Sequence, residues 1–365
     1  MRIFIDAAIV KPELGGIATY VAGVVEGLAE QSDVKVCVAT STPEKISAPP
    51  DVDVVELPRA VRSFPRRLAW RERDLRRLVA DHDADVLLAP TIEPPARDIG
   101  VPVIMVIHDL GPLLAPGLYG WKRWLRYAAG IGPACRRADQ VVCVSNATLL
   151  QLRTALGRIA TPCSVVGEAG RKLPVLIRAP RQPPYVLAVG AMLDHKNIDT
   201  LVRAMGHPDL AGVELQLAGP ISTHELRRLD RLRAEVARPE RIAHHGFVDL
   251  LTLAHLYAEA SVVALPSLYE GFGLPMLEAM RAGAPVVASS IPAHQEVGGN
   301  AAMYVNEPLS VDTWAHAIGL VVSDPERSRT LERASVEHVA DISWMTIGAH
   351  FAELFRELVA TWTPS

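Results

Sequence analysis

The chain alternates short apolar runs with segments whose apolar residues recur at helical spacing. The first run, residues 2–6, is followed by Gly15-Gly16 and then by apolar residues three or four apart from Ile17 to Leu28. Strands separated by helices predict a parallel sheet covered by helices, which binds ligands at the carboxyl ends of its strands. Further apolar runs occupy residues 34–39, 52–57, 84–89, 101–107 and 140–144.

The alternation begins again at Tyr185, after a stretch rich in proline and charge. A chain of 365 residues exceeds what one hydrophobic core usually fills, and such a stretch is typical of a linker. We therefore predict an α/β protein with two doubly wound, Rossmann-like domains. The predicted parts are a first domain at 1–170, a linker at 171–184, a second domain at 185–342 and a terminal helical segment at 343–365.

Composition places the chain among ordinary globular proteins. Apolar residues make up 49% and charged residues 21%, and the net charge of −4 gives no general reason to expect nucleic-acid binding. No apolar stretch reaches the roughly 20 residues of a spanning helix, and residues 1–6 do not have the layout of a signal peptide. We expect a cytoplasmic protein.

The four cysteines form no Cys-x-x-Cys pair, and Cys37 and Cys143 lie inside apolar runs. This distribution is typical of buried free thiols in a reducing compartment. The sequence therefore predicts neither a zinc site nor a disulfide framework.

The most informative stretch is a glycine-rich loop after the apolar run 261–266. Pro275 fits the first turn of a helix and Gly283 fits its end, so the pattern predicts a strand, a tight loop and a short helix. Such a turn directs backbone N–H groups and the positive end of the helix toward a ligand, and glycine permits close approach. The expected ligand is an anion, with phosphate the first choice.

Two carboxylates bracket this loop, Glu270 before the helix and Glu278 within it. Carboxylates beside a phosphate site suit the hydroxyls of a sugar better than the phosphate itself, because like charges repel. The alternative is that Glu270 only favours the helix N-terminus and Glu278 is a solvated helical residue.

Residues 266–287 resemble the retaining glycosyltransferases of family 4. These enzymes share a motif of two glutamates separated by seven residues. It lies within the longer string Pro-Ser-x-x-Glu-Gly-Phe-Gly-Leu-Pro-x-x-Glu-Ala-Met-Ala-x-Gly-x-Pro-Val-Val, and here Arg281 stands where Ala is usual. The resemblance implies the GT-B fold, in which two such domains face a cleft and the C-terminal segment crosses back onto the first domain. It also implies a nucleotide diphosphate sugar as donor.

The resemblance assigns roles to several residues. Residues 190–197 resemble Gly-x-x-x-x-Arg-Lys-Asn, in which the lysine, here Lys196, contacts the donor diphosphate, although His195 replaces the usual arginine. Glu270 would hold hydroxyls of the donor sugar, Glu278 those of the ribose, and His108 would contact the sugar from the first domain. The implied catalytic residues are therefore His108, Lys196 and Glu270. The implied donor-binding residues are Gly15, Gly16, Gly190, Lys196, Phe247, Val248, Glu270, Gly271, Phe272, Gly273, Leu274 and Glu278.

The string Ile-His-Asp-Leu-x-Pro around His108 resembles members that act with mannose-like or 6-deoxy sugars. We therefore expect transfer of such a hexose, with GDP-mannose as first guess, to a glycan, a glycolipid or a small molecule, without a metal cofactor. Two alternatives stay open. One is an epimerase or phosphorylase of the same fold, and the other is a non-catalytic glycosyltransferase-like subunit.

Two basic stretches, residues 59–77 and 121–126, alternate arginine with aromatic and aliphatic residues. Such a pattern suits peripheral contact with an anionic membrane, which would place the protein at the inner membrane face. The other interpretation is a solvated outer helix face.

Overall fold

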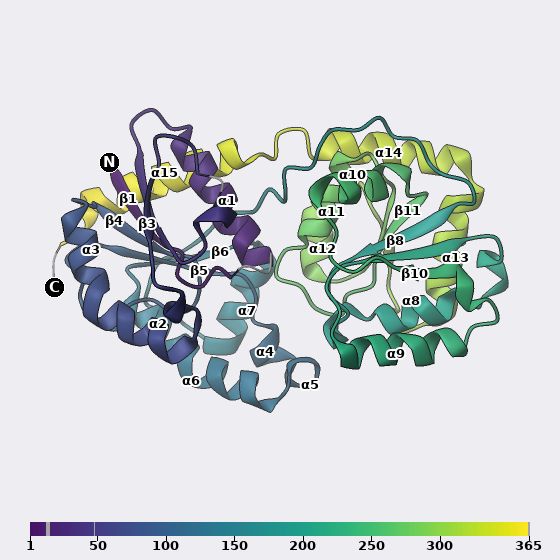
Figure 1. Cartoon of the computed structure of the whole chain (residues 1–365), viewed down its shortest axis with the longest axis horizontal. Helices are drawn as coiled ribbons and strands as arrows, with labels where there is room; N and C mark the ends of the chain where they lie inside the picture. The colour runs from purple at the N-terminus through teal and green to yellow at the C-terminus, as the bar shows by residue number, and fades with distance from the viewer. Residues whose placement is uncertain (12–14, 47, 364–365) are drawn as a thin grey trace. The chain divides into compact units, whose positions relative to one another are not determined.

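The computed structural model describes residues 1–11, 15–46 and 48–363. They form two compact units, which are described separately below (Figure 1). The first contains Met1–Pro116, Gly120–Gly170 and Ile342–Ser365, and the second contains Gly117–Tyr119 and Arg171–Asp341. The last two residues of the predicted terminal segment 343–365 lie outside the described part of the chain.

The first unit is built on a parallel sheet with the strand order β3-β2-β1-β4-β5-β6-β7. This is the order of the Rossmann fold, extended by one edge strand. The inner strands are buried and apolar because helices cover both faces. The strands are β1 (Arg2–Asp6), β2 (Lys35–Thr40), β3 (Asp53–Glu56), β4 (Val86–Ala89), β5 (Val103–Ile107), β6 (Gln140–Cys143) and β7 (Cys163–Val165).

In Figure 1, α1 and α15 lie on one side of this sheet and α2, α3 and α6 on the other. Ser145 caps one helix of the unit, since its side chain accepts a hydrogen bond from the Thr148 N–H. The helices are α1 (Gly16–Ala29), α2 (Phe64–Trp70), α3 (Arg76–Asp81), α4 (Gly111–Leu114), α6 (Trp121–Arg137), α7 (Asn146–Leu156) and α15 (Trp344–Thr361), with a π-helical turn at Arg71–Leu75 between α2 and α3. The short helix α5 (Pro116–Tyr119) follows α4, and its residues Gly117–Tyr119 are assigned to the second unit.

The C-terminal helix α15 packs directly on α1, and glycines make this contact possible. A Cβ atom on Gly23 would lie 2.0 Å from the indole ring of Trp344, and one on Gly27 would lie 1.9 Å from the Trp344 carbonyl oxygen. The Trp344 indole N–H donates to the carbonyl of Gly170 at 2.7 Å. The described part of the terminal segment therefore packs within the first unit.

The second unit repeats the architecture with the order β10-β9-β8-β11-β12-β13. The order reverses between β8 and β11, which is where Rossmann folds bind ligands. The strands are β8 (Tyr185–Val189), β9 (Glu214–Ala218), β10 (Ile242–His244), β11 (Val262–Leu265), β12 (Val286–Ser289) and β13 (Met303–Val305). The helices are α8 (Ile198–Ala204), α9 (Thr223–Ala234), α10 (Leu250–Glu259), α11 (Leu274–Arg281), α12 (Pro292–Gly298), α13 (Val311–Ser323) and α14 (Pro325–His338).

The predicted linker runs along the second unit. The N–H groups of Ala179 and Arg181 donate to the carbonyls of Ala258 and Glu259. The sequence pattern did not reveal β7 and β13, because each has only three residues and neither forms an apolar run that stands out. The prediction of two Rossmann-like α/β domains is confirmed.

Candidate active site

A small pocket of the second unit lies at the carboxyl ends of β8 and β11, where the strand order reverses. Gly190 lines it directly after β8, and Pro266 and Ser267 line it after β11. Lys196, Glu270, Gly273 and His294 complete the polar side of its wall. The predicted glycine-rich loop therefore lies where this fold binds ligands.

A tight turn positions Lys196. The chain leaves β8, makes a short helical turn at Asp194–Lys196, and passes through Asn197 in the left-handed conformation at φ 52°. Asparagine tolerates this conformation better than most residues. Its amide donates to the carbonyls of Pro266 at 3.1 Å and Pro308 at 2.7 Å, which fastens the turn to the end of β11.

Lys196 and Glu270 form an ion pair, with 2.5 Å between Nζ and Oε1. The Ser267 hydroxyl donates to the same carboxylate at 2.6 Å. Burial by itself raises the pKa of Glu270, but the Lys196 ammonium, the nearby His294 and the Ser267 hydroxyl outweigh it and lower the pKa to about 2. The pocket therefore holds a carboxylate that is ionised at neutral pH and paired with Lys196.

Helix α11 begins beside this pair. Gly273 precedes the helix with φ 115°, a backbone conformation that residues other than glycine rarely adopt. Pro275 occupies the first turn of the helix. A Cβ atom on Gly273 would approach the His294 ring to 3.4 Å. The positive end of the helix therefore reaches the pocket wall, which suits an anionic ligand.

His294 is a pocket residue that sequence reasoning missed. It lies in α12, directly after β12, and it is almost fully buried. Burial lowers its pKa more than Glu270 raises it, so the ring is neutral and donates from Nδ1 to the carbonyl of Ser289. The available signal was its position just past a strand's carboxyl end.

Glu278 occupies a different environment from Glu270. Its carboxylate is buried, accepts hydrogen bonds from Arg171 Nε at 2.6 Å and Nη2 at 2.7 Å, and accepts a third from the Tyr257 hydroxyl at 2.9 Å. The alternative of a solvated helical glutamate is wrong, because the side chain faces into the unit. For Glu278 to bind the ribose as predicted, Arg171 or Tyr257 would have to give up its hydrogen bond to one of the Glu278 carboxylate oxygens.

The other predicted donor-binding residues of this unit surround the same strand ends. Gly219 packs so closely on the carbonyl of Gly190 that a Cβ atom on it would lie 2.1 Å away. Phe247 is 57% exposed beyond β10, and Val248 follows it. Gly271, Phe272 and Leu274 form the loop between Glu270 and the first turn of α11.

In the first unit, His108 follows β5. Its Nδ1 lies 2.9 Å from a Glu168 carboxylate oxygen, and its Nε2 lies 3.0 Å from the Pro90 carbonyl oxygen. The Pro90 carbonyl can only accept a hydrogen bond, so Nε2 donates to it. Burial lowers the pKa of His108, but Glu168 and Pro90 outweigh it and raise the pKa above its ordinary value.

Gly15 and Gly16 open α1, as predicted. Gly15 is the N-cap, and a Cβ atom on it would meet no other atom within 4 Å. Packing among the described residues therefore does not require glycine at residue 15.

The basic stretch 59–77 is not uniformly a surface face. Arg67 and Arg71 are buried and hold two carboxylates at the ends of β1 and β4. Arg71 donates to Asp6 at 2.5 Å and to Glu93 at 2.7 Å, and Arg67 makes two hydrogen bonds to Glu93. The prediction of a solvated or membrane-facing stretch is wrong for these two arginines, because they neutralise buried carboxylates.

Comparison with known proteins defines the class of this protein, because two glycosyltransferase family models match most of its length. The family described as "Glycosyltransferase Family 4" matches residues 14–167, and the one described as "Glycosyl transferases group 1" matches residues 175–338. The chain belongs to the family 4 glycosyltransferases and has the GT-B fold.

Three similar proteins illustrate the relationship. The O-antigen chain mannosyltransferase RfbU of Salmonella typhimurium is 27% identical over 222 residues, and the match spans 61% of this chain and 61% of that relative. Sucrose-phosphate synthase of Thermosynechococcus elongatus shares the fold with a TM-score of 0.82 at 22% identity, over 99% of this chain and 100% of that one. HepE of Anabaena, solved with UDP-glucose, has a TM-score of 0.76 at 18% identity, over 98% and 100%.

Proposed function

We propose that the protein transfers a hexose from a nucleotide diphosphate sugar to an acceptor hydroxyl with retention of the anomeric configuration. The observation that carries this proposal is the Lys196–Glu270 pair at the strand ends, beside the N-terminus of α11. An ammonium and a helix N-terminus suit a diphosphate, and a fixed carboxylate suits sugar hydroxyls. One pocket wall thus offers groups for both parts of the donor.

The difficult step is departure of the diphosphate while positive charge grows on the sugar ring. In the proposed reaction the bond between the anomeric carbon and the phosphate oxygen breaks, and a bond to the acceptor oxygen forms on the same face. The departing phosphate takes the acceptor's proton. Lys196 and the end of α11 stabilise the charge on the leaving group, and no protein nucleophile is required.

We propose a mannose-like donor sugar, with GDP-mannose the first donor to test. The relative RfbU is named a mannosyltransferase, and the string around His108 points to the same sugars. We further propose that the reaction needs no metal cofactor. The acceptor is a glycan, a glycolipid or a small molecule with a free hydroxyl.

A thermal-shift panel with GDP-mannose, UDP-glucose, UDP-N-acetylglucosamine and dTDP-rhamnose tests the donor. A ligand that binds only the folded protein at 100 times its dissociation constant adds about 2.7 kcal/mol of stability. We expect GDP-mannose to raise the unfolding temperature most. A larger response to another donor would replace the mannose assignment, and no response to any nucleotide sugar or free nucleotide would favour the non-catalytic alternative.

Product analysis separates the enzymatic alternatives. A transferase gives a glycosylated acceptor and free nucleoside diphosphate only when an acceptor is present. Release of nucleoside diphosphate without an acceptor would indicate an epimerase, and a requirement for inorganic phosphate would indicate a phosphorylase.

We also propose that the first unit docks on an anionic membrane surface through helices α2 and α6. Exposed apolar side chains occur on both helices, and the Arg126 guanidinium lies 5.9 Å from the centre of the Phe64 ring, so the helices are neighbours (Figure 1). Aromatic rings among basic residues suit the interface of an anionic bilayer. The exposed apolar residues are Phe64, Leu68, Trp121, Trp124 and Leu125. Among the described residues, no helix is long and apolar enough to span a bilayer.

Co-sedimentation with vesicles tests this docking. We expect the protein to bind phosphatidylglycerol vesicles and not phosphatidylcholine vesicles, with weaker binding at high salt because the basic residues are exposed. The double variant Trp121→Ala/Trp124→Ala should lose binding. Leu309→Ala, which removes an equally exposed apolar side chain from the second unit, should keep it. Equal binding of both variants would contradict the proposal.

A further inference from the structure

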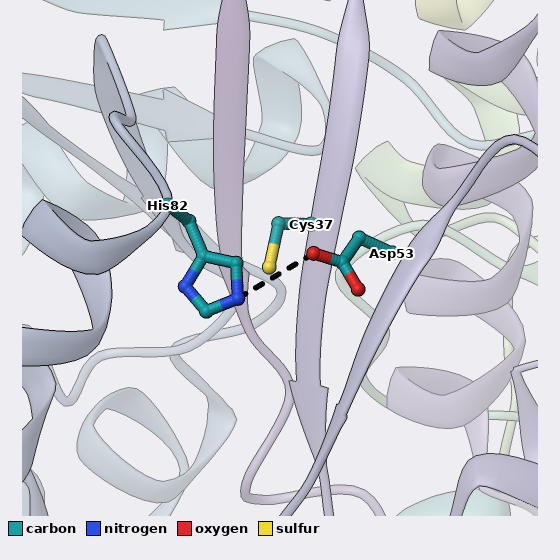
Figure 2. Close-up of side chains that lie close together, drawn as sticks. All are labelled: Cys37, Asp53 and His82. Carbon is teal, nitrogen blue, oxygen red and sulfur yellow. Dashed lines mark ion pairs between the residues drawn. The ribbon is translucent and has the colours of Figure 1, made fainter.

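A group of metal-ligating side chains lies at the edge of the first sheet, away from the carboxyl ends of the strands. Cys37 of β2 and Asp53, the first residue of β3, are direct partners in the parallel register. His82 follows α3 in the turn that leads to β4. Figure 2 shows the Cys37 sulfur, the Asp53 carboxylate and the His82 ring converging on one point.

The three potential ligand atoms lie within 4.8 Å of one another. The distance between His82 Nε2 and Asp53 Oδ2 is 3.4 Å, drawn as a dashed line in Figure 2. Two ligands on a tetrahedral metal, each about 2.0–2.1 Å from it, are separated by about 3.3 Å. A metal ion could therefore bind both of these atoms with little movement of their side chains. The Cys37 sulfur would have to move slightly toward the ion.

The orientation of the imidazole supports a ligand role. His82 Nδ1 lies 2.8 Å from the Leu78 carbonyl oxygen, which can only accept a hydrogen bond. This contact places a hydrogen on Nδ1 and leaves Nε2, the atom that faces Asp53 and Cys37, as the nitrogen that a metal ion could bind. Metal-bound histidines usually donate their second ring N–H to a carbonyl or carboxylate in this way.

Further contacts hold the turn that carries His82. Arg2 donates to the Asp83 carboxylate at 2.7 Å, and the Arg2 backbone N–H donates to Asp85 at 2.7 Å. The His82 ring also packs edge-on against Phe4 of β1, with ring centres 5.8 Å apart. The nearby positive charge of Arg2 is paired with Asp83. His82 is therefore positioned before any metal arrives.

From this geometry we propose that Cys37, Asp53 and His82 bind one zinc ion, with solvent as the fourth ligand. Thiolate and imidazole ligands select zinc over magnesium or calcium, which prefer oxygen ligands. Thiolate and carboxylate together neutralise the charge of Zn²⁺, and the 64% exposed Asp53 side chain offers a path from solvent. On binding, the Cys37 thiol releases its proton to solvent and the sulfur forms the new bond to zinc.

The consequence is structural. The ion would connect the edge strand β3 with β2 and with the turn before β4, which are separate segments of the chain. The site lies outside the donor pocket of the second unit. It is therefore independent of the proposed transfer reaction, and zinc should raise the thermal stability of the protein rather than supply its chemistry.

Zinc binding to tag-free, chelator-stripped full-length protein tests the proposal. We expect one equivalent in competition with a colorimetric chelator, and a rise in unfolding temperature on zinc addition. Cobalt(II) in place of zinc should give a thiolate-to-metal charge-transfer band. Cys37→Ser should abolish that band and weaken zinc binding by more than the roughly 10- to 100-fold that loss of an outer-sphere partner costs.

Matched variants make the test decisive. Asp53→Asn removes a largely exposed ligand without disturbing the core, so it should fold normally and still lose affinity. Cys163→Ser removes a half-buried thiol of another strand, and Asp51→Asn removes a carboxylate close to Asp53 in the sequence. Both variants should bind zinc like the wild type. The proposal is overturned by an absence of zinc binding, by full binding in Cys37→Ser or Asp53→Asn, or by equal losses in the control variants.

Discussion

Replacing Lys196 by alanine is expected to lower the rate of glycosyl transfer by about 100- to 1,000-fold, the cost of losing one preorganised group that stabilises developing charge. Lys196 is the ammonium in the wall of the donor pocket, and the Asn197 turn fixes its backbone. Lys196→Arg keeps the charge and should retain part of the activity. Steady-state rates with the donor identified by thermal shift measure the effect.

The controls for Lys196 must separate chemistry from folding, because its removal leaves Glu270 without its cation. The double variant Lys196→Ala/Glu270→Gln removes that unpaired charge and should recover stability but not activity. Lys35→Ala, which removes an exposed lysine of the first unit, should behave like the wild type. Transfer at wild-type rate by a well-folded Lys196→Ala protein would remove Lys196 from the proposed mechanism.

Arg171→Ala is expected to destabilise the second unit by about 3 kcal/mol, because it removes the guanidinium that is paired with the buried Glu278 carboxylate. The hydrogen bonds from the Tyr257 hydroxyl and from the backbone N–H of residue 171 remain. For a unit of this size the loss corresponds to a fall of roughly 6–12 °C in its unfolding temperature. Calorimetry or urea unfolding monitored for this unit measures the change. Arg181→Ala removes the exposed partner of Glu214 and should cost less than about 1 kcal/mol.

A double variant distinguishes a structural pair from a ligand-binding one. Arg171→Met/Glu278→Leu replaces both charges by apolar side chains, and stability should return close to that of the wild type. If Glu278 also holds the ribose, this stable variant should still lose its thermal response to nucleotide. A double variant as unstable as Arg171→Ala would contradict the account of the buried pair.

The local sequence was sufficient to predict much of the fold and the glycine-rich loop. Apolar runs of strand length predicted the inner strands of both sheets. Pro275 lies in the first turn of α11 (Leu274–Arg281), and Gly283 follows its end. Gly273 has a backbone conformation that favours glycine, so the residue itself indicates the turn before the helix. Such features can be read along the chain because neighbouring residues determine them.

Contacts between distant residues could not be predicted in this way. Arg171 meets Glu278 across 107 positions of sequence, and Arg71 meets Asp6 across 65. In the sequence each of these arginines is one charge among many, and only the fold shows which of them are buried. Cys37 is a buried free thiol, as predicted, but its position beside Asp53 could not be predicted, because the register of β2 with β3 is absent from any local pattern.

The glycine contact between α1 and α15 has a consequence for how this protein is made and rearranged. The first unit takes its last helix from the end of the chain, so on a ribosome it stays incomplete until the second unit has been synthesised. Until then Gly23 and Gly27 of α1 lack the Trp344 atoms that pack against them in the finished unit. A chimera that exchanges first units between relatives must therefore exchange two separate segments, including the helix that begins at Trp344.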